Sequence, residues 1–182
     1  MKVIITDCDH ESMDIEEKIF ADAGIEMELK QAFSEDEVIE QCQDGDIFIV
    51  QYANITEKVM DHCPKLKYVV RYGVGVDTVD VPAATSRGIQ VGNVPDYGMN
   101  EVADHAIALA LALSRKIVKM DAFTKDEKWD YIESIPVHRF SEQTVGVVGL
   151  GRIGRNFAKK MNGLGFRVIG TDPYFHATRE TE

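Results

Sequence analysis

A glycine-rich turn after a short apolar run constrains the fold of this chain more than any other stretch. Residues 145–148 read Val-Gly-Val-Val, which predicts a buried strand of a parallel sheet. Gly149, Gly151 and Gly154 follow at once in the spacing G-x-G-x-x-G. We expect this turn to connect the strand to a helix.

The residues after the turn complete a strand–helix–strand pattern. A helix is predicted over residues 152–162, with Gly163 and Gly165 as its stop signals. A second strand is predicted over residues 166–170, and Asp172 stands at its end, eighteen residues after Gly154. That offset is close to the roughly 20 residues that separate the glycines from the acid in a dinucleotide-binding unit.

Each glycine has a distinct task if the turn binds a dinucleotide. Gly149 permits the tight turn, Gly151 lets the backbone approach a pyrophosphate, and Gly154 lets the helix pack on the strand. The N–H groups of Arg152 and Ile153 open the helix, where unpaired donors and the helix dipole attract phosphate. The alternative is a glycine-rich turn in some other parallel sheet.

Asp172 indicates which dinucleotide would bind. Its carboxylate would accept hydrogen bonds from the ribose hydroxyls of the adenosine and would repel a 2′-phosphate. The sequence therefore predicts NAD, rather than NADP, as the cofactor.

Composition excludes several classes of partner. A formal net charge of −11 argues against nucleic acid and against an anionic membrane.

The cysteines and the first residues indicate the location of the protein. The three cysteines, Cys8, Cys42 and Cys63, are odd in number and lack metal-ligand spacing, so reduced thiols, no metal site and a cytoplasmic location are expected. Asp7 and Asp9 so near the start argue against a secretory leader, and the longest apolar run is far too short to span a membrane.

The first half of the chain alternates between strand and helix patterns. Such alternation predicts an open parallel sheet of the flavodoxin type with helices on both faces, over residues 1–98. The expected strands are 2–6, 26–29, 46–50, 66–71 and 89–91, and the expected helices are 11–23, 35–42, 56–63 and 80–86.

Residues 99–182 are expected to form the first part of a Rossmann domain. They begin with a long helix predicted over residues 100–119, with Asn100 as a plausible cap. Its middle is apolar nearly all round, which predicts burial on more than one side, between domains or at a subunit interface. Residues 120–144 are expected to form a surface connection.

A second glycine-rich segment, Arg71-Tyr-Gly-Val-Gly-Val-Asp-Thr-Val-Asp, follows the fourth predicted strand. In open α/β sheets the ligand crevice lies at the carboxyl ends of the strands. Gly73 and Gly75 would let the N–H groups of Val74 and Gly75 converge on a small carboxylate. The alternative is an ordinary strand–helix turn. Tyr52 and Tyr97 also follow strand ends, where they would either contact the substrate or pack in the core or at the rim.

Four segments, in order, carry a family resemblance. They are residues 71–80, Asn93-Val-Pro-Asp, Glu101-Val-Ala-Asp-His and Gly149-Leu-Gly-Arg-Ile-Gly. Together they resemble the D-isomer-specific 2-hydroxyacid dehydrogenases, and most nearly the phosphoglycerate dehydrogenase and C-terminal-binding-protein-like groups. The resemblance implies a two-domain protein, usually a homodimer, that moves a hydride between NAD and C2 of a 2-hydroxy or 2-oxo acid.

The resemblance also assigns roles to individual residues. Val74 and Gly75 would contact the substrate carboxylate, and Val74 also the nicotinamide. Val102 would contact the cofactor, and the helix over residues 100–119 would be a dimer element. The resemblance also implies that the backbone of Arg152 and Ile153 and the carboxylate of Asp172 would contact the dinucleotide.

The same resemblance leaves no catalytic residue in this sequence. The family's catalytic Arg, Glu and His would lie beyond residue 182, so a fragment or truncated product without turnover is expected. One rival hypothesis is a non-catalytic NAD-sensing or interaction protein. Another, from a different class, is a haloacid-dehalogenase-type phosphatase, because Asp7-Cys-Asp9 follows the first strand.

Overall fold

The computed structural model describes residues 1–175, which divide into two compact units, Met1–Tyr97 and a second that begins at Gly98. The first unit contains the strands β1 (Lys2–Ile5), β2 (Glu26–Leu29), β3 (Ile47–Val50), β4 (Tyr68–Arg71) and β5 (Gln90–Gly92). All pair in parallel in the order β2-β1-β3-β4-β5. This is the flavodoxin-like strand order, so the predicted fold class is confirmed.

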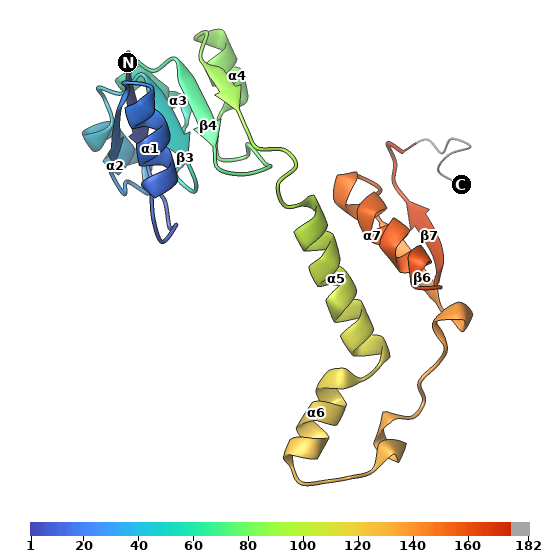
Figure 1. Cartoon of the computed structure of the whole chain (residues 1–182). Helices are drawn as coiled ribbons and strands as arrows, with labels where there is room; N and C mark the ends of the chain where they lie inside the picture. The colour runs from blue at the N-terminus through green and yellow to red at the C-terminus, as the bar shows by residue number, and fades with distance from the viewer. Residues whose placement is uncertain (176–182) are drawn as a thin grey trace. The chain divides into compact units, whose positions relative to one another are not determined.

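Four helices connect these strands (Figure 1). They are α1 (Asp14–Asp22), α2 (Glu35–Gln41), α3 (Glu57–His62) and α4 (Val81–Ser86). Helix α2 begins with a capping box: Glu37 N donates to Ser34 Oγ at 3.3 Å, and Ser34 N donates to Glu37 Oε2 at 2.9 Å. Thr56 is the N-cap of α3 but makes no side-chain cap. Helix α1 begins three residues later than predicted.

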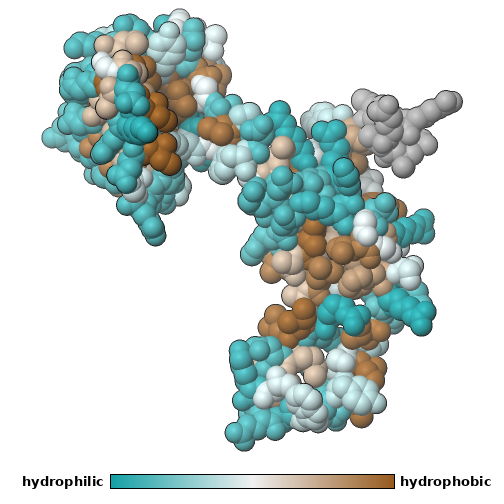
Figure 2. Space-filling view, viewed as in Figure 1, coloured by the Kyte–Doolittle hydropathy of each residue, from teal (hydrophilic) through white to brown (hydrophobic). Residues whose placement is uncertain are grey.

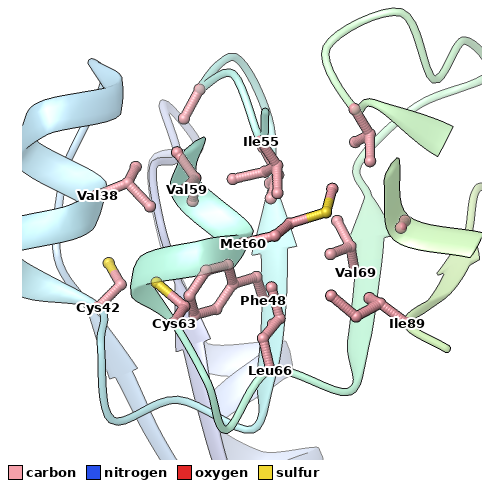
Figure 3. Close-up of a cluster of buried hydrophobic side chains, with 14 of the residues drawn as sticks. Val38, Cys42, Phe48, Ile55, Val59, Met60, Cys63, Leu66, Val69 and Ile89 are labelled. Atoms are coloured by element: carbon pink, nitrogen blue, oxygen red, sulfur yellow. The ribbon is translucent and has the colours of Figure 1, made fainter. Parts of the chain in front are cut away.

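Alternation along the strands divides the core into two layers. Ile4, Phe48 and Val69 point to the face covered by α2, α3 and α4, where Phe48 is fully buried among Val59, Met60 and Cys63 (Figure 3). Val3, Ile5 and Ile49 point to the opposite face, toward Phe20 of α1. Successive side chains of a strand face opposite sides, so one sequence of apolar residues supplies both layers.

The cysteines of this unit are free and buried. Burial raises the pKa of Cys42 to about 12 and that of Cys63 to about 11. At pH 8 at most about 1 in 1,000 of either thiol is then ionised, and the thiolate is the reactive form. We expect both to react slowly with Ellman's reagent in the native chain, while denaturant exposes all three cysteines. Rapid labelling of two or more thiols in the native chain would contradict this.

The second unit combines a parallel strand pair with helices. Its elements are α5 (Met99–Ser114), α6 (Ile117–Lys125), the short 3-10 helices η1 (Tyr131–Ser134) and η2 (Phe140–Glu142), β6 (Thr144–Val148), α7 (Arg152–Gly163) and β7 (Arg167–Thr171). Strands β6 and β7 pair in parallel, with Val145 opposite Val168. The predicted strand–helix–strand unit is therefore present, and it is the opening unit of a Rossmann fold.

Helices α5 and α7 pack against each other over a small core of Ile107, Met161 and Phe166, with the rings of Phe140 and Phe166 stacked at 4.3 Å. Leu113, farther along α5, is 81% exposed. Figure 2 shows apolar side chains at the surface where α5 and α7 lie in Figure 1. Within this chain α5 is thus buried along one side. Burial of a second side, between domains or at a subunit interface, stays a prediction.

Two details of the long helix differ from the prediction. The helix predicted over residues 100–119 is two helices, because Lys116 takes a left-handed conformation with φ 54° and separates α5 from α6. Its N-cap is Gly98 and not Asn100. The Asn100 side chain instead accepts a hydrogen bond from Asn156 Nδ2 at 2.7 Å, which ties the start of α5 to α7.

Among residues 1–175, no helix is long and apolar enough to cross a membrane.

Candidate functional site

The glycine-rich turn has the close approaches that the sequence predicts. Gly149 has φ +92°, which a residue with a side chain rarely adopts. A Cβ on Gly154 would lie 1.9 Å from the carbonyl oxygen of Gly149, so α7 meets the turn at backbone contact. A Cβ on Gly151 would meet no atom within 4 Å. The turn is therefore closed on its helix side and open beside Gly151.

Helix α7 begins immediately after this open position. Gly151 is its N-cap and provides no side-chain acceptor, and Arg152 and Ile153 are its first two residues. The first N–H groups of a helix have no partner in the helix itself and favour anions. Helix α7 runs through Gly163, which is therefore not a stop signal, whereas Gly165 follows the helix with φ +92°.

Asp172 joins the end of β7 to the glycine-rich turn. Its Oδ2 accepts a hydrogen bond from Leu150 N at 2.7 Å, and its Oδ1 accepts one from Tyr174 N at 2.8 Å. These two backbone donors lower the pKa of Asp172, the Tyr174 amide most. The carboxylate is therefore ionised at neutral pH and is held beside the turn, an arrangement that sequence spacing alone does not reveal.

Val102, the remaining predicted cofactor contact, lies in the first turn of α5. Its side chain is about half exposed, whereas its neighbour Ala103 is buried. It thus belongs to the same unit as the glycine-rich turn and is accessible to a ligand.

The first unit holds the second predicted site, in the loop after β4. Asn93 Nδ2 donates to Val74 O at 2.7 Å, and Val94 N donates to Gly73 O at 3.0 Å, so the residues after β5 fix the loop. Within residues 1–175 the N–H groups of Val74 and Gly75 donate to no protein acceptor, and Val74 is exposed. Both amides can therefore donate to a small carboxylate.

Polar side chains lie close to both glycines of the loop. A Cβ on Gly73 would lie 1.4 Å from Arg71 Nη1, and one on Gly75 would lie 2.5 Å from Asp77 Oδ1. Gly73 therefore gives room to the Arg71 guanidinium where it lies, and a Cβ at either glycine would require the Arg71 or Asp77 side chain to move. Tyr52 and Tyr97 are both exposed, so neither packs in the core.

The two aspartates after β1 have separate structural roles. Asp7 is fully buried, and its carboxylate accepts hydrogen bonds from the amides of Gln51, Tyr52 and Ala53 at 2.5–3.3 Å. Asp9 is exposed and accepts from Tyr52 Oη at 2.8 Å. The carboxylate of Asp7 is thus engaged by the backbone amides that follow β3. In the described residues no group of three or more His, Cys, Asp or Glu side chains could hold a metal ion.

Comparison with known proteins places this architecture in a family. The model for the D-isomer specific 2-hydroxyacid dehydrogenase catalytic domain matches residues 3–181. D-3-phosphoglycerate dehydrogenase of Methanocaldococcus jannaschii is 37% identical over 175 residues, which are 96% of this chain and 32% of that protein. The enzyme of the same name from Rattus norvegicus is 37% identical over 157 residues, which are 86% of this chain and 29% of that protein. The chain thus spans about a third of the length of these curated relatives.

Solved structures give the same result. An acyclic imino acid reductase, Bsp5, in complex with NADPH and D-Arg, superposes with a TM-score of 0.84 at 26% identity, over 98% of this chain and 58% of that one. D-2-hydroxyisocaproate dehydrogenase superposes with a TM-score of 0.78 at 27% identity, over 98% of this chain and 55% of that one. On its sequence and its fold, the chain belongs to the D-isomer specific 2-hydroxyacid dehydrogenase family.

Proposed function

We propose that this chain provides the dinucleotide turn and the substrate-carboxylate loop of an oxidoreductase that transfers a hydride between NAD and C2 of a 2-hydroxy or 2-oxo acid. The observation that carries the proposal is the turn itself: Gly154 at backbone contact with Gly149, an open position at Gly151, and the ionised Asp172 held by the Leu150 amide. NAD, when bound, accepts or supplies the hydride.

The residues of the turn fit such a cofactor. Gly151 leaves the space that a pyrophosphate would occupy, and the first N–H groups of α7, those of Arg152 and Ile153, would donate to its oxygens. The Asp172 carboxylate would accept from the ribose hydroxyls of the adenosine. Val102, exposed in the first turn of α5, would add an apolar contact.

The substrate would be held by the other unit. The amides of Val74 and Gly75 would donate to its carboxylate and orient C2.

The proposal assigns no catalytic acid or base within residues 1–182. In the complete protein it assigns the exposed apolar side of α5, which includes Leu109 and Leu113, to the contact between two copies.

Asp172→Asn tests the cofactor half of the proposal. Loss of a charged acceptor should weaken NAD binding roughly tenfold and should reduce the preference for NAD over NADP. Titration of the chain with NADH and NADPH, followed by nucleotide fluorescence, measures both. Asp126→Asn, at an exposed residue of the same unit, is the matched control.

The pH dependence of binding has a defined sign. The pKa of Asp172 is lowered, so its charge is present throughout the neutral range and is lost only below the usual range of a carboxyl group. NAD affinity should therefore be constant between about pH 5 and 8 and should fall in acid. Unchanged NAD affinity in Asp172→Asn would contradict the proposed cofactor site.

A further inference from the structure

Beside the carboxylate loop, side chains from two neighbouring strand ends form a hydrogen-bonded group. Tyr52 Oη donates to Asp9 Oδ2 at 2.8 Å, and Gln51 Nε2 donates to Asp9 Oδ1 at 2.5 Å. In return, Asp9 N donates to Gln51 Oε1 at 2.9 Å. Asp9 and Tyr52 are both exposed, so this group holds one carboxylate at the solvent side of the sheet's carboxyl edge.

Arg71 connects this group to the glycine loop. Tyr72 N donates to Val50 O at 2.8 Å, which brings the end of β4 beside the end of β3. The guanidinium then folds over Gly73, where its Nη1 occupies the space of a missing Cβ. Its Nε is buried and has no hydrogen-bond partner among the described residues.

The charges of the group are fixed. Hydrogen bonds from Tyr52 and Gln51 lower the pKa of Asp9, so this carboxylate is ionised at neutral pH. The hydrogen bond to Asp9 raises the pKa of Tyr52, and the positive charge of Arg71 opposes that shift. The phenol is therefore neutral, its proton is directed at Asp9, and Arg71 lies within electrostatic reach of the phenol.

A ligand carboxylate and a second anionic group would meet different surroundings here. A carboxylate on the amides of Val74 and Gly75 lies beside the Arg71 guanidinium, which favours it. The rings of His10 and Tyr72 pack edge to face with centroids 5.1 Å apart, so the segment that carries Asp9 lies against the segment that begins the loop. A second anionic group on the same small molecule would therefore approach the fixed charge of Asp9. The Tyr52 hydroxyl cannot compensate, because its proton is already donated.

We propose that the Asp9–Tyr52 pair makes this site select 2-hydroxy and 2-oxo acids with a single negative charge and reject acids that carry a second anionic group, such as a phosphate. Asp9 and Tyr52 act as specificity-determining residues that touch no reacting atom. The inference rests on the proposed function, since it takes the Val74–Gly75 loop as the place of the substrate carboxylate.

The test compares two acids on the 182-residue chain. D-lactate and 3-phospho-D-glycerate are titrated at matched ionic strength, while ¹H–¹⁵N spectra follow the amides of Val74 and Gly75. The phosphorylated acid should bind more weakly than D-lactate. In Asp9→Asn, which keeps an acceptor for Tyr52 and removes the charge, the ratio of the two dissociation constants should fall about fivefold to tenfold.

Two further variants isolate the charge of Asp9. Asp9→Glu restores the charge and should restore most of the ratio. Asp22→Asn changes the net charge equally at the exposed end of α1 and should leave the ratio unchanged. Far-UV circular dichroism confirms that each variant is folded.

The outcomes separate the two proposals. A ratio that is the same in wild type and Asp9→Asn, or tighter binding of the phosphorylated acid to the wild type, overturns the selectivity and leaves the proposed function standing. If neither acid moves the two amides, the carboxylate loop and this inference both fail. The NADH titration reports independently on the cofactor half.

Discussion

Gly154→Ala should destabilise the second unit by about 3 kcal/mol, because the new methyl group has nowhere to go. Its carbon would lie 1.9 Å from the Gly149 carbonyl oxygen and 3.5 Å from Val147 Cγ1. The turn and the first part of α7 meet through backbone atoms at this point, so the clash with the Gly149 carbonyl oxygen cannot be relieved by rotating a side chain. Relief requires α7 to move off the turn, which also disperses the N–H groups proposed to bind phosphate.

Gly163→Ala is the matched control for this prediction. Gly163 lies in the last turn of the same helix, and a Cβ there would meet no atom within 4 Å. Alanine reduces the conformational entropy of the unfolded chain, so this variant should be stabilised by about 0.5–1 kcal/mol. Urea unfolding and the NADH titration would be measured on both. Equal stability of the two variants would show that α7 does not pack on the turn as described.

Asp7→Ala should cost the first unit about 3–5 kcal/mol. The carboxylate is fully buried, and its Oδ2 accepts from Tyr52 N at 2.5 Å while its Oδ1 accepts from Thr6 Oγ1 at 2.7 Å. Removing it leaves the amides of Gln51, Tyr52 and Ala53 without their acceptor, whereas Thr6 Oγ1 can still donate to Ile49 O at 3.2 Å. A buried donor without a partner loses the hydration that it had in the unfolded chain.

Hydrogen exchange makes the Asp7 prediction specific to a segment. The amides of residues 51–53 should exchange much faster in Asp7→Ala, while those of β1 change only with global stability. Asp36→Asn is the control, since Asp36 is an exposed carboxylate that pairs with Lys58, and its removal should hardly move the unfolding midpoint. Unchanged protection of Tyr52 N in Asp7→Ala would be inconsistent with the network.

Patterns within short segments were sufficient to predict most of the secondary structure. The strand runs, the Ser34–Glu37 capping box and the glycine spacing each depend on residues a few positions apart. Local steric and hydrogen-bonding preferences decide such features, and alternation of strand with helix then leaves few topologies open. The parallel sheet and the βαβ unit are therefore found as expected, with bounds that differ by a few residues.

Features that depend on distant partners were not predictable in this way. Asn100 is of a residue type that often caps helices, but its side chain is hydrogen-bonded to Asn156, fifty-six residues away, and Gly98 is the N-cap. Lys116 carries no helix-breaking signal, yet its left-handed conformation divides the long helix. At Asn100 the local preference is weak, and a tertiary contact outweighs it. Among residues 1–175 the structure gives no such contact as the cause of the break at Lys116.

The sequence by itself determined the class of the fold, the position of the glycine-rich turn and the family, since each rests on the order and spacing of nearby residues. The tertiary structure alone decided what the polar side chains do: Asp7 buried under the 51–53 amides, Asp9 joined to Tyr52, and Asp172 joined to the Leu150 amide. These partners lie 22 to 46 residues apart. A hydrogen bond acts over about 3 Å, so only the folded chain can form it.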